Sequence, residues 1–161
     1  MANYAKKRNM ADVPKVLAVS GSLRATSFST AIFRALSQEE HLGIALTVKT
    51  LEDIPLYNED LDTDPPLTSI AELRNEVQAS DGIVIATPEY NHGMPGVLKN
   101  ALDWASRPAF ASCFRGKPVL IITSASGGTG GVRAARNASC YAGARNFRSR
   151  DSSFRRGEPN P

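Results

Sequence analysis

The sequence predicts an α/β fold in which a parallel, doubly wound sheet carries helices on both faces. Two observations lead to this prediction. Four short apolar runs alternate with segments of helical periodicity, and one of these runs, 83–87, is almost continuously apolar. Such a run is typical of a strand in the middle of a parallel sheet, and the alternation of strands with helices is typical of this fold class.

The first half of the chain predicts two strands with a helix between them. A buried-type strand spans 15–20 and a helix spans 27–40, which Gly43 ends. The segment 44–51 alternates between apolar and polar residues, which predicts a strand closer to the sheet edge. The apolar positions at helical spacing in the helix are Phe28, Ile32, Phe33 and Leu36.

In the second half of the chain, a helix followed by a strand is predicted twice. An acidic, proline-bearing loop is expected at 53–66 and is followed by a helix. The predicted elements are a helix over 67–80, a strand over 83–87, a helix over 94–106 and a strand over 118–124. Pro95 is compatible with a helix because it falls in the first turn, where its missing N–H has no helical partner.

The length of 161 residues predicts a single domain with flanking segments. We expect a disordered lead-in at 1–14, a folded domain at 15–133, and a basic, disordered tail at 134–161. The tail has few aliphatic residues, many arginines and serines and no clear period. A truncated or frameshifted C-terminus is one interpretation of this tail, and a natural short variant is the other. Without a further strand, the strand at 118–124 would be an exposed edge.

Composition excludes several classes of protein. The apolar run near Ile83 is too short for a membrane span, and the basic N-terminus has no apolar segment after it, so we expect a cytoplasmic protein. Cys113 and Cys140 predict neither a disulfide framework nor a zinc site, and no metal is expected. Residues 133–161 hold seven of the 19 basic and two of the 16 acidic residues, which leaves 12 basic and 14 acidic residues for the body. The basic character therefore belongs to the tail, and no nucleic-acid partner is expected.

The loop after the first strand is the candidate phosphate site. It reads Ser20-Gly21-Ser22-Leu23-Arg24 and leads into a helix, whose N-terminal amides and dipole favour an anion. Arg24 can pair with a phosphate. The loop is neither a Walker A motif nor a Gly-x-Gly-x-x-Gly motif. Taken alone, its serines also fit ordinary loop and cap positions.

Two more loops leave strand ends at the same predicted edge of the sheet. The second, 87–93, combines backbone amides with the ring of Tyr90 and suits the edge of a planar heterocycle. A rigid turn is the alternative for this loop, and His92 is expected to be a solvated loop residue. The third, 124–131, has four glycines, which permit a close approach of the backbone to a ligand. Ligands of open α/β sheets bind at the carboxyl ends of the strands, so the three loops predict one site.

Several motifs carry a resemblance to a known family. They are the loop 20–24 with Ser27, the segment 56–60, the Thr-Pro-Glu-Tyr-Asn segment 87–91, and the segment 95–108, which contains Gly-Val-Leu-Lys-Asn-Ala-Leu-Asp-Trp. Over roughly 13–133 the chain resembles the NADPH-dependent FMN reductase family, in particular its chromate, quinone and azo-dye reductase branch. The resemblance implies a flavodoxin-like fold, of whose usual five strands four are evident here.

The resemblance also implies the cofactors and the site. FMN would bind without a covalent link, NADPH or NADH would be the co-substrate, and the protein would be a homodimer or homotetramer. Ser20, Ser22, Arg24, Ser27 and Ser29 would hold the phosphate of FMN. The isoalloxazine and ribityl parts would contact Pro88, Glu89, Tyr90 and Asn91. The other edge of the ring would face Ser124, Ala125, Ser126, Gly127 and Gly128.

The expected reaction passes electrons from NAD(P)H through FMN to a small acceptor by a ping-pong mechanism. Because the flavin carries the chemistry, no residue is assigned as catalytic, while Tyr90 and Arg107 are expected to shape the acceptor pocket. Quinones, azo dyes, chromate and free flavin all fit as acceptors. The alternatives are a flavodoxin-like electron carrier with no NAD(P)H reaction of its own, and a truncated relative that binds no flavin.

Overall fold

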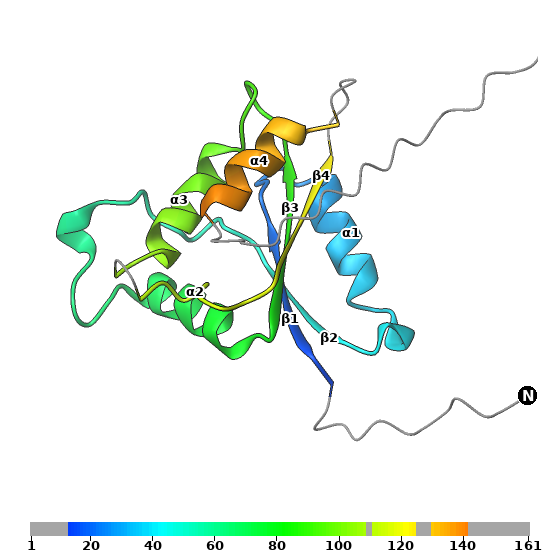
Figure 1. The fold of residues 1–161 in the computed structure, drawn as a ribbon, viewed down its shortest axis with the longest axis horizontal. Helices are drawn as coiled ribbons and strands as arrows, with labels where there is room; N and C mark the ends of the chain where they lie inside the picture. Colours follow the sequence, from blue (N-terminus) through cyan, green and yellow to red (C-terminus); the bar gives the residue numbers. More distant parts are fainter. Residues whose placement is uncertain (1–12, 109–110, 125–129, 142–161) are drawn as a thin grey trace, which may run out of the picture.

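A four-stranded parallel sheet forms the centre of the described protein. The computed structural model describes residues 13–108, 111–124 and 130–141. Within these residues the strands lie in the order β2-β1-β3-β4, with all neighbours parallel (Figure 1). Their bounds are β1 (Lys15–Ser20), β2 (Ala45–Lys49), β3 (Gly82–Pro88) and β4 (Val119–Ser124). The predicted α/β class and the edge position of β2 are therefore confirmed.

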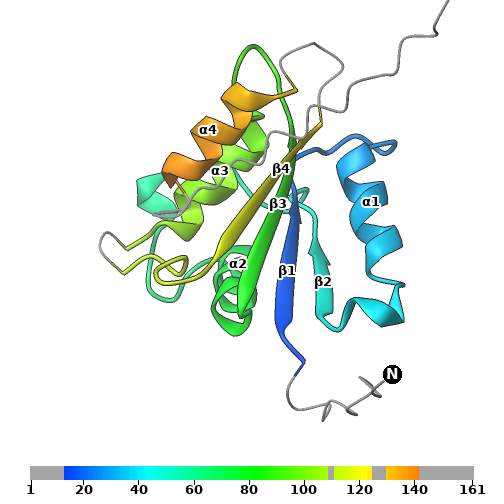
Figure 2. The same ribbon diagram turned by 45° about the vertical axis from the view of Figure 1, so that its right-hand side comes forward.

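Helices cover both faces of this sheet. Helix α1 (Phe28–Leu36) lies on one face, while α2, α3 and α4 lie on the other (Figure 2). Their bounds are α2 (Thr68–Ala79), α3 (Gly96–Ala105) and α4 (Val132–Tyr141). Two short 3₁₀ turns, Glu40–Leu42 and Glu59–Leu61, lie in the connections. None of the described helices combines the length and apolar character needed to cross a membrane.

The apolar core is unequal on the two faces. The larger cluster lies between the sheet and α2 and α3, where Trp104, Leu98 and Ile85 are fully buried. The smaller cluster lies under α1 and centres on Ala18, Phe33 and Ala86. β3 contributes to both clusters, which explains why its sequence is apolar at consecutive positions.

Helix α1 is shorter than the predicted helix 27–40. It ends at Leu36 because Ser37 follows as the C-cap and its hydroxyl donates to the carbonyl of Arg34 (2.9 Å). The predicted apolar face is also partly wrong, since Phe28 and Ile32 are 70% and 45% exposed. Phe33 is the residue of this helix that enters the core.

Strand β4 forms one edge of the sheet in the described part of the chain. Val119 and Ile121 pack against the larger core, whereas Leu120 and Ile122, on the opposite face, are 55% and 37% exposed. Alternate residues of a strand point to opposite faces. The side chains of β4 therefore meet a helix layer on one face and solvent on the other.

Both predicted ends of the folded domain shift outward. Before β1, the carbonyl of Pro14 accepts a hydrogen bond from the amide of Ala45 (2.8 Å), so Pro14 belongs to the sheet and not to a lead-in. After β4, residues 132–141 form α4, and the predicted disorder of 134–141 is wrong. Helix α4 packs on β3, β4 and α3 through buried Ala134 and Ala138. Alanine has the highest helix propensity but a weak apolar signal, which explains the error.

The two cysteines are both free and differ in environment. Cys113 is buried and its thiol donates to the carbonyl of Ala105 (3.1 Å), while Cys140 is exposed on α4. Burial raises the pKa of Cys113 from 9.0 to about 11, so its reactive thiolate forms only as the pH approaches 11. At pH 8 we expect iodoacetamide to modify Cys140 of the folded protein and to spare Cys113, as read by peptide mass spectrometry. Equal rates at both cysteines would contradict this, and unfolding in urea should make both reactive.

Candidate functional site

The described parts of the three predicted loops lie at the carboxyl edge of the sheet. Strand register places Ser20 beside Ala86 and Pro88 beside Ser124, so the loops leave adjacent strand ends (Figure 1). The first loop is tied to β3 because the amide of Gly21 donates to the carbonyl of Ala86 (2.8 Å). The predicted single site at this edge thus has a geometric basis.

Gly21 allows the first loop to approach β3 closely. A Cβ atom added at Gly21 would lie 2.9 Å from Thr87 Oγ1 and 3.2 Å from the carbonyl oxygen of Ala86. Thr87 is fully buried and therefore cannot move aside easily. A side chain at position 21 would push the first loop away from the second.

The first loop presents hydrogen-bond donors and a positive charge. Ser27 Oγ is the N-cap of α1 and accepts from the amide of Thr30 (3.4 Å). Arg24 is exposed, and its guanidinium donates to Thr26 Oγ1 (3.2 Å). Within the described residues, the amides of Leu23, Ala25 and Thr26 have no hydrogen-bond acceptor. Amides, hydroxyls and a guanidinium around a helix N-terminus are the donor set that suits a phosphate.

All four serines among the predicted phosphate ligands are buried, with 0% to 6% of their surface exposed: Ser20, Ser22, Ser27 and Ser29. Ser20 is completely buried, and its Oγ shares a 2.8 Å hydrogen bond with Thr30 Oγ1. Its hydroxyl thus supports the loop from inside, and its assignment to the phosphate stays a prediction. Ser29 is also buried, but it lies in the first turn of α1, where a backbone N–H lacks a helical acceptor. This backbone N–H is therefore available to an anion.

The second loop is a tight turn with an unusual backbone. Tyr90 and Gly93 exchange two backbone hydrogen bonds of 2.9 and 3.0 Å, and between them Asn91 and His92 adopt φ values of 49° and 65°. This left-handed region is rare for residues other than glycine and is enriched at functional sites. The ring of Tyr90 is 46% exposed and is available to a ligand.

Two side chains of this loop make contacts that the sequence did not predict. The carboxylate of Glu89 accepts from the backbone amides of Arg133 and Ala134 at the start of α4 (3.0 and 3.3 Å). His92, predicted to be solvated, is exposed but has its Nδ1 2.9 Å from the Arg133 guanidinium. Nothing in the sequence around Arg133 marks it as a partner of residues more than forty positions earlier.

The third loop is described only at its two ends. Ser124 ends β4 and is exposed, while Ala125, Ser126, Gly127 and Gly128 lie outside the described residues. Thr123 Oγ1 donates to the carbonyl of Gly130 (2.6 Å), which ties the two ends of the loop together.

Tyr90 and Arg107, both expected at the acceptor pocket, are separated by α3. Tyr90 precedes the start of α3 and Arg107 follows its end, and a ten-residue helix is about 15 Å long. The guanidinium of Arg107 lies over the ring of Tyr57, with its carbon 5.4 Å from the ring centroid. Tyr90 therefore lies at the ligand edge, while the place of Arg107 in an acceptor pocket stays a prediction.

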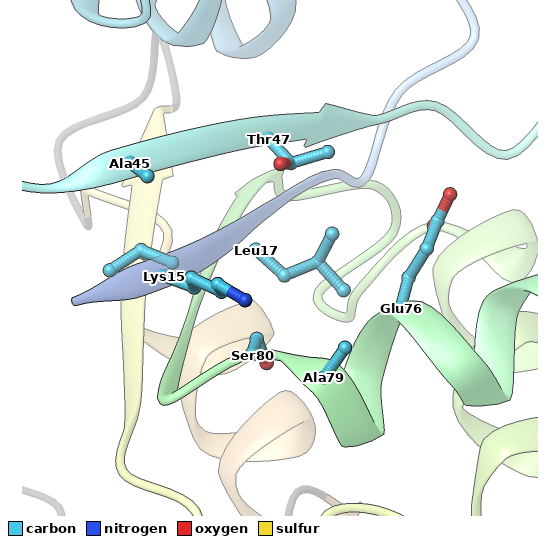
Figure 3. A pocket seen from close by; sticks show the side chains of 8 residues that line it. Lys15, Leu17, Ala45, Thr47, Glu76, Ala79 and Ser80 are labelled. Carbon is cyan, nitrogen blue, oxygen red and sulfur yellow. The ribbon is translucent and has the colours of Figure 1, made fainter. Parts of the chain in front are cut away.

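A cavity of about 290 Å³ lies at the opposite end of the sheet. Lys15, Leu17, Ala45, Thr47, Glu76, Ala79 and Ser80 are among the residues that line it (Figure 3). Lys15 and Ala45 are the first residues of β1 and β2, so the cavity faces away from the three loops. Open α/β sheets bind ligands at the carboxyl edge, and this cavity is not part of the candidate site. The described residues contain no group of His, Cys, Asp and Glu that could hold a metal ion.

Sequence comparison gives the same family that the motifs indicate. The model of the family described as NADPH-dependent FMN reductase matches residues 14–149. A quinone reductase from Pseudomonas putida is 40% identical over 125 residues, which are 78% of this chain and 67% of that enzyme. This chain therefore spans about two thirds of the length of that relative. The family match extends past residue 133, where the resemblance was expected to end.

Structure comparison gives the same fold. A flavoenzyme NAD(P)H:(acceptor) oxidoreductase from Paracoccus denitrificans superposes with a TM-score of 0.66 at 34% identity, covering 80% of this chain and 71% of that one. A WrbA-like flavodoxin from Agrobacterium tumefaciens superposes with a TM-score of 0.55 at 19% identity, covering 81% of this chain and 72% of that one. The second likeness concerns the fold alone, and it confirms the predicted flavodoxin-like arrangement.

Proposed function

Because this chain belongs to the NADPH-dependent FMN reductase family, we propose that it passes electrons from NAD(P)H through FMN to a quinone. It is an oxidoreductase, and its cofactors are FMN and a reduced nicotinamide nucleotide. The quinone is proposed because a relative of 40% identity is a quinone reductase. Assembly into a dimer or tetramer and a cytoplasmic location stay predictions.

The donor set of the first loop is the observation that carries this proposal. The amides of Leu23, Ala25 and Thr26, which have no acceptor among the described residues, and the exposed guanidinium of Arg24 precede the N-terminus of α1, and they fit a phosphate monoester. Ser22 and Ser27 add hydroxyl groups. FMN ends in such a phosphate, so the loop fits this cofactor.

The other two loops would hold the ring system of FMN. Pro88, Tyr90 and Asn91 lie at the end of β3, next to the strand end of Ser124, and offer an exposed aromatic ring and a rigid backbone. Ala125, Ser126, Gly127 and Gly128 complete this proposed set. When bound, FMN supplies the electron transfer, and the protein supplies its orientation and its electrostatic surroundings. A single site used in turn by NAD(P)H and by the acceptor would give ping-pong kinetics.

An anaerobic absorbance experiment tests the proposal. The purified protein is mixed with FMN, freed of excess FMN, and then given NADPH and finally benzoquinone. We expect flavin bands that bleach with NADPH and return with benzoquinone, and initial rates whose double-reciprocal lines are parallel. Retained flavin that does not bleach would favour an electron carrier, and no retained flavin would overturn the proposal.

Replacing Arg24 tests the phosphate site directly. A charge-assisted hydrogen bond contributes about 1.5–3 kcal/mol, so we expect Arg24→Ala to weaken FMN binding by about 10- to 100-fold. The dissociation constant can be measured by quenching of FMN fluorescence. Arg34→Ala is the matched control, because Arg34 is an exposed arginine in the last turn of the same helix, α1, away from the loop. Equal affinities for the two variants would contradict the assignment of Arg24.

A further inference from the structure

Glu89 has a carboxylate that is committed to another part of the protein. Its side chain is only 9% exposed, and Oε2 accepts from the amides of Arg133 and Ala134. These amides belong to the first turn of α4, where no helical acceptor exists. A negative charge at this end of a helix is also favourable, because it opposes the positive end of the helix dipole. The carboxylate therefore caps α4.

Arg133 reaches back from α4 to the same loop. Its NH1 lies 3.6 Å from Glu89 Oε1 and 2.9 Å from His92 Nδ1. A guanidinium can only donate, so Nδ1 of His92 is the acceptor in this contact. On the next turn of α4, Asn137 sits against Gly93, where an added Cβ would be 3.0 Å from Asn137 Oδ1. The loop is thus held on α4 at both of its ends.

This attachment has a mechanical reason. Asn91 and His92 occupy the left-handed region, which costs of the order of 1 kcal/mol or more for each residue. Such a conformation persists only where the surrounding contacts hold it. The two backbone hydrogen bonds between Tyr90 and Gly93 close this turn, and the cap from Glu89 and the Arg133–His92 contact add restraint on either side of Asn91.

We propose that Glu89, His92 and Arg133 form a clasp that fixes the loop 88–93 on α4, with Glu89 as a positioning residue for FMN. In this role Glu89 sets the place of Tyr90 and Asn91 and does not bind the ring through its carboxylate. The clasp rests on the proposed function in one respect, namely that the loop contacts FMN.

Three substitutions of Glu89 separate the effect of side-chain length, which lets the side chain reach the amides of α4, from the effect of its negative charge. Glu89→Gln keeps the length of the side chain and an oxygen that accepts from the α4 amides. Glu89→Asp keeps the charge but is one methylene too short to reach them, and Glu89→Ala removes the cap. Glu72→Gln is the matched control, because Glu72 is an exposed glutamate on α2 and not on the three loops at the ligand edge.

We expect FMN affinity to depend on whether the side chain at position 89 still reaches the amides of α4. Glu89→Gln should stay within about threefold of the wild type, whereas Glu89→Asp and Glu89→Ala should bind FMN about tenfold more weakly. The near-ultraviolet and visible circular dichroism of bound FMN should shift in the Asp and Ala variants only. An opposite order, with Asp like the wild type and Gln impaired, would show that the charge acts on FMN and would overturn the clasp.

Hydrogen exchange of the protein without FMN separates this inference from the proposed function. The amides of Arg133 and Ala134 should exchange faster in Glu89→Asp and Glu89→Ala and at the wild-type rate in Glu89→Gln and Glu72→Gln. Unchanged exchange in Glu89→Ala would overturn the clasp whatever the flavin does. Faster exchange with unchanged FMN affinity would overturn the positioning role. A wild-type protein that fails to bind FMN would overturn the proposed function, and the positioning role with it, even where the exchange rates follow the expected order.

Discussion

Gly131→Ala is expected to destabilise the protein by about 2–5 kcal/mol, the sum of a backbone cost and a steric cost. Gly131 has a φ of +81°, which an alanine adopts only under strain. An added Cβ would also lie 2.7 Å from the Cβ of Thr123, closer than real Cβ contacts allow. Thr123 cannot yield, because it lies in β4 and its hydroxyl holds the carbonyl of Gly130. Urea unfolding followed by far-ultraviolet circular dichroism measures the loss.

Gly96→Ala is the control for this substitution. Gly96 is the first residue of α3, and an added Cβ would meet no atom within 4 Å. Alanine is favoured over glycine within a helix by about 0.5–1 kcal/mol. The control should therefore be as stable as the wild type or slightly more stable, and a similar loss in both variants would refute the steric account.

Trp104→Ala is expected to cost about 3–5 kcal/mol, the range for removing a large aromatic side chain from a core. Trp104 is fully buried at the centre of the larger cluster, with its ring edge-on to Tyr57 at a centroid distance of 4.8 Å. Its Nε1 donates to the carbonyl of Pro55 (2.8 Å), so the substitution also removes one of the hydrogen bonds that hold the connection after β2, while those from Asn100 remain. Unfolding should be followed by circular dichroism, because Trp104 is the single tryptophan of the protein and its substitution removes the tryptophan fluorescence.

Two further variants serve as comparisons for the stability loss of Trp104→Ala. Trp104→Phe keeps most of the volume but loses the hydrogen bond to Pro55, so it should cost less than Trp104→Ala. Leu56→Ala removes an apolar residue from the same connection, but Leu56 is 84% exposed, and its loss should stay within about 0.5 kcal/mol. A loss below about 1 kcal/mol for Trp104→Ala would show that α3 is not the centre of the core.

Much of the fold could be predicted from local patterns, because the strands are short apolar runs with clear ends. Strand β1 has the predicted bounds, and the predicted helix 67–80 matches α2 to within one residue at each end. Helix α4 could not be predicted in this way. Its buried face is made of alanines, and the group that caps its N-terminus is Glu89, far away in the sequence.

The candidate site was predictable as a set of loops but not in the roles of single side chains. Parallel strands with loops at the same edge bring 20–29, 87–93 and 124–131 together, whatever the sequence inside them. Whether a serine faces the ligand or the core depends on tertiary contacts. Ser20 Oγ shares a hydrogen bond with Thr30 of α1, a partner ten positions later that no local pattern indicates.

The order of the strands also bears on how the chain forms while it is being synthesised. β2 and β3 both pair with β1, and β4 pairs with β3, so every strand after the first adds to one that has already been made. Chains emerge from the ribosome N-terminus first. The growing sheet can therefore add each strand as it appears, first on one side of β1 and then on the other. The strand ends that flank the first two ligand loops, on β1 and β3, can therefore pair before β4 has been synthesised.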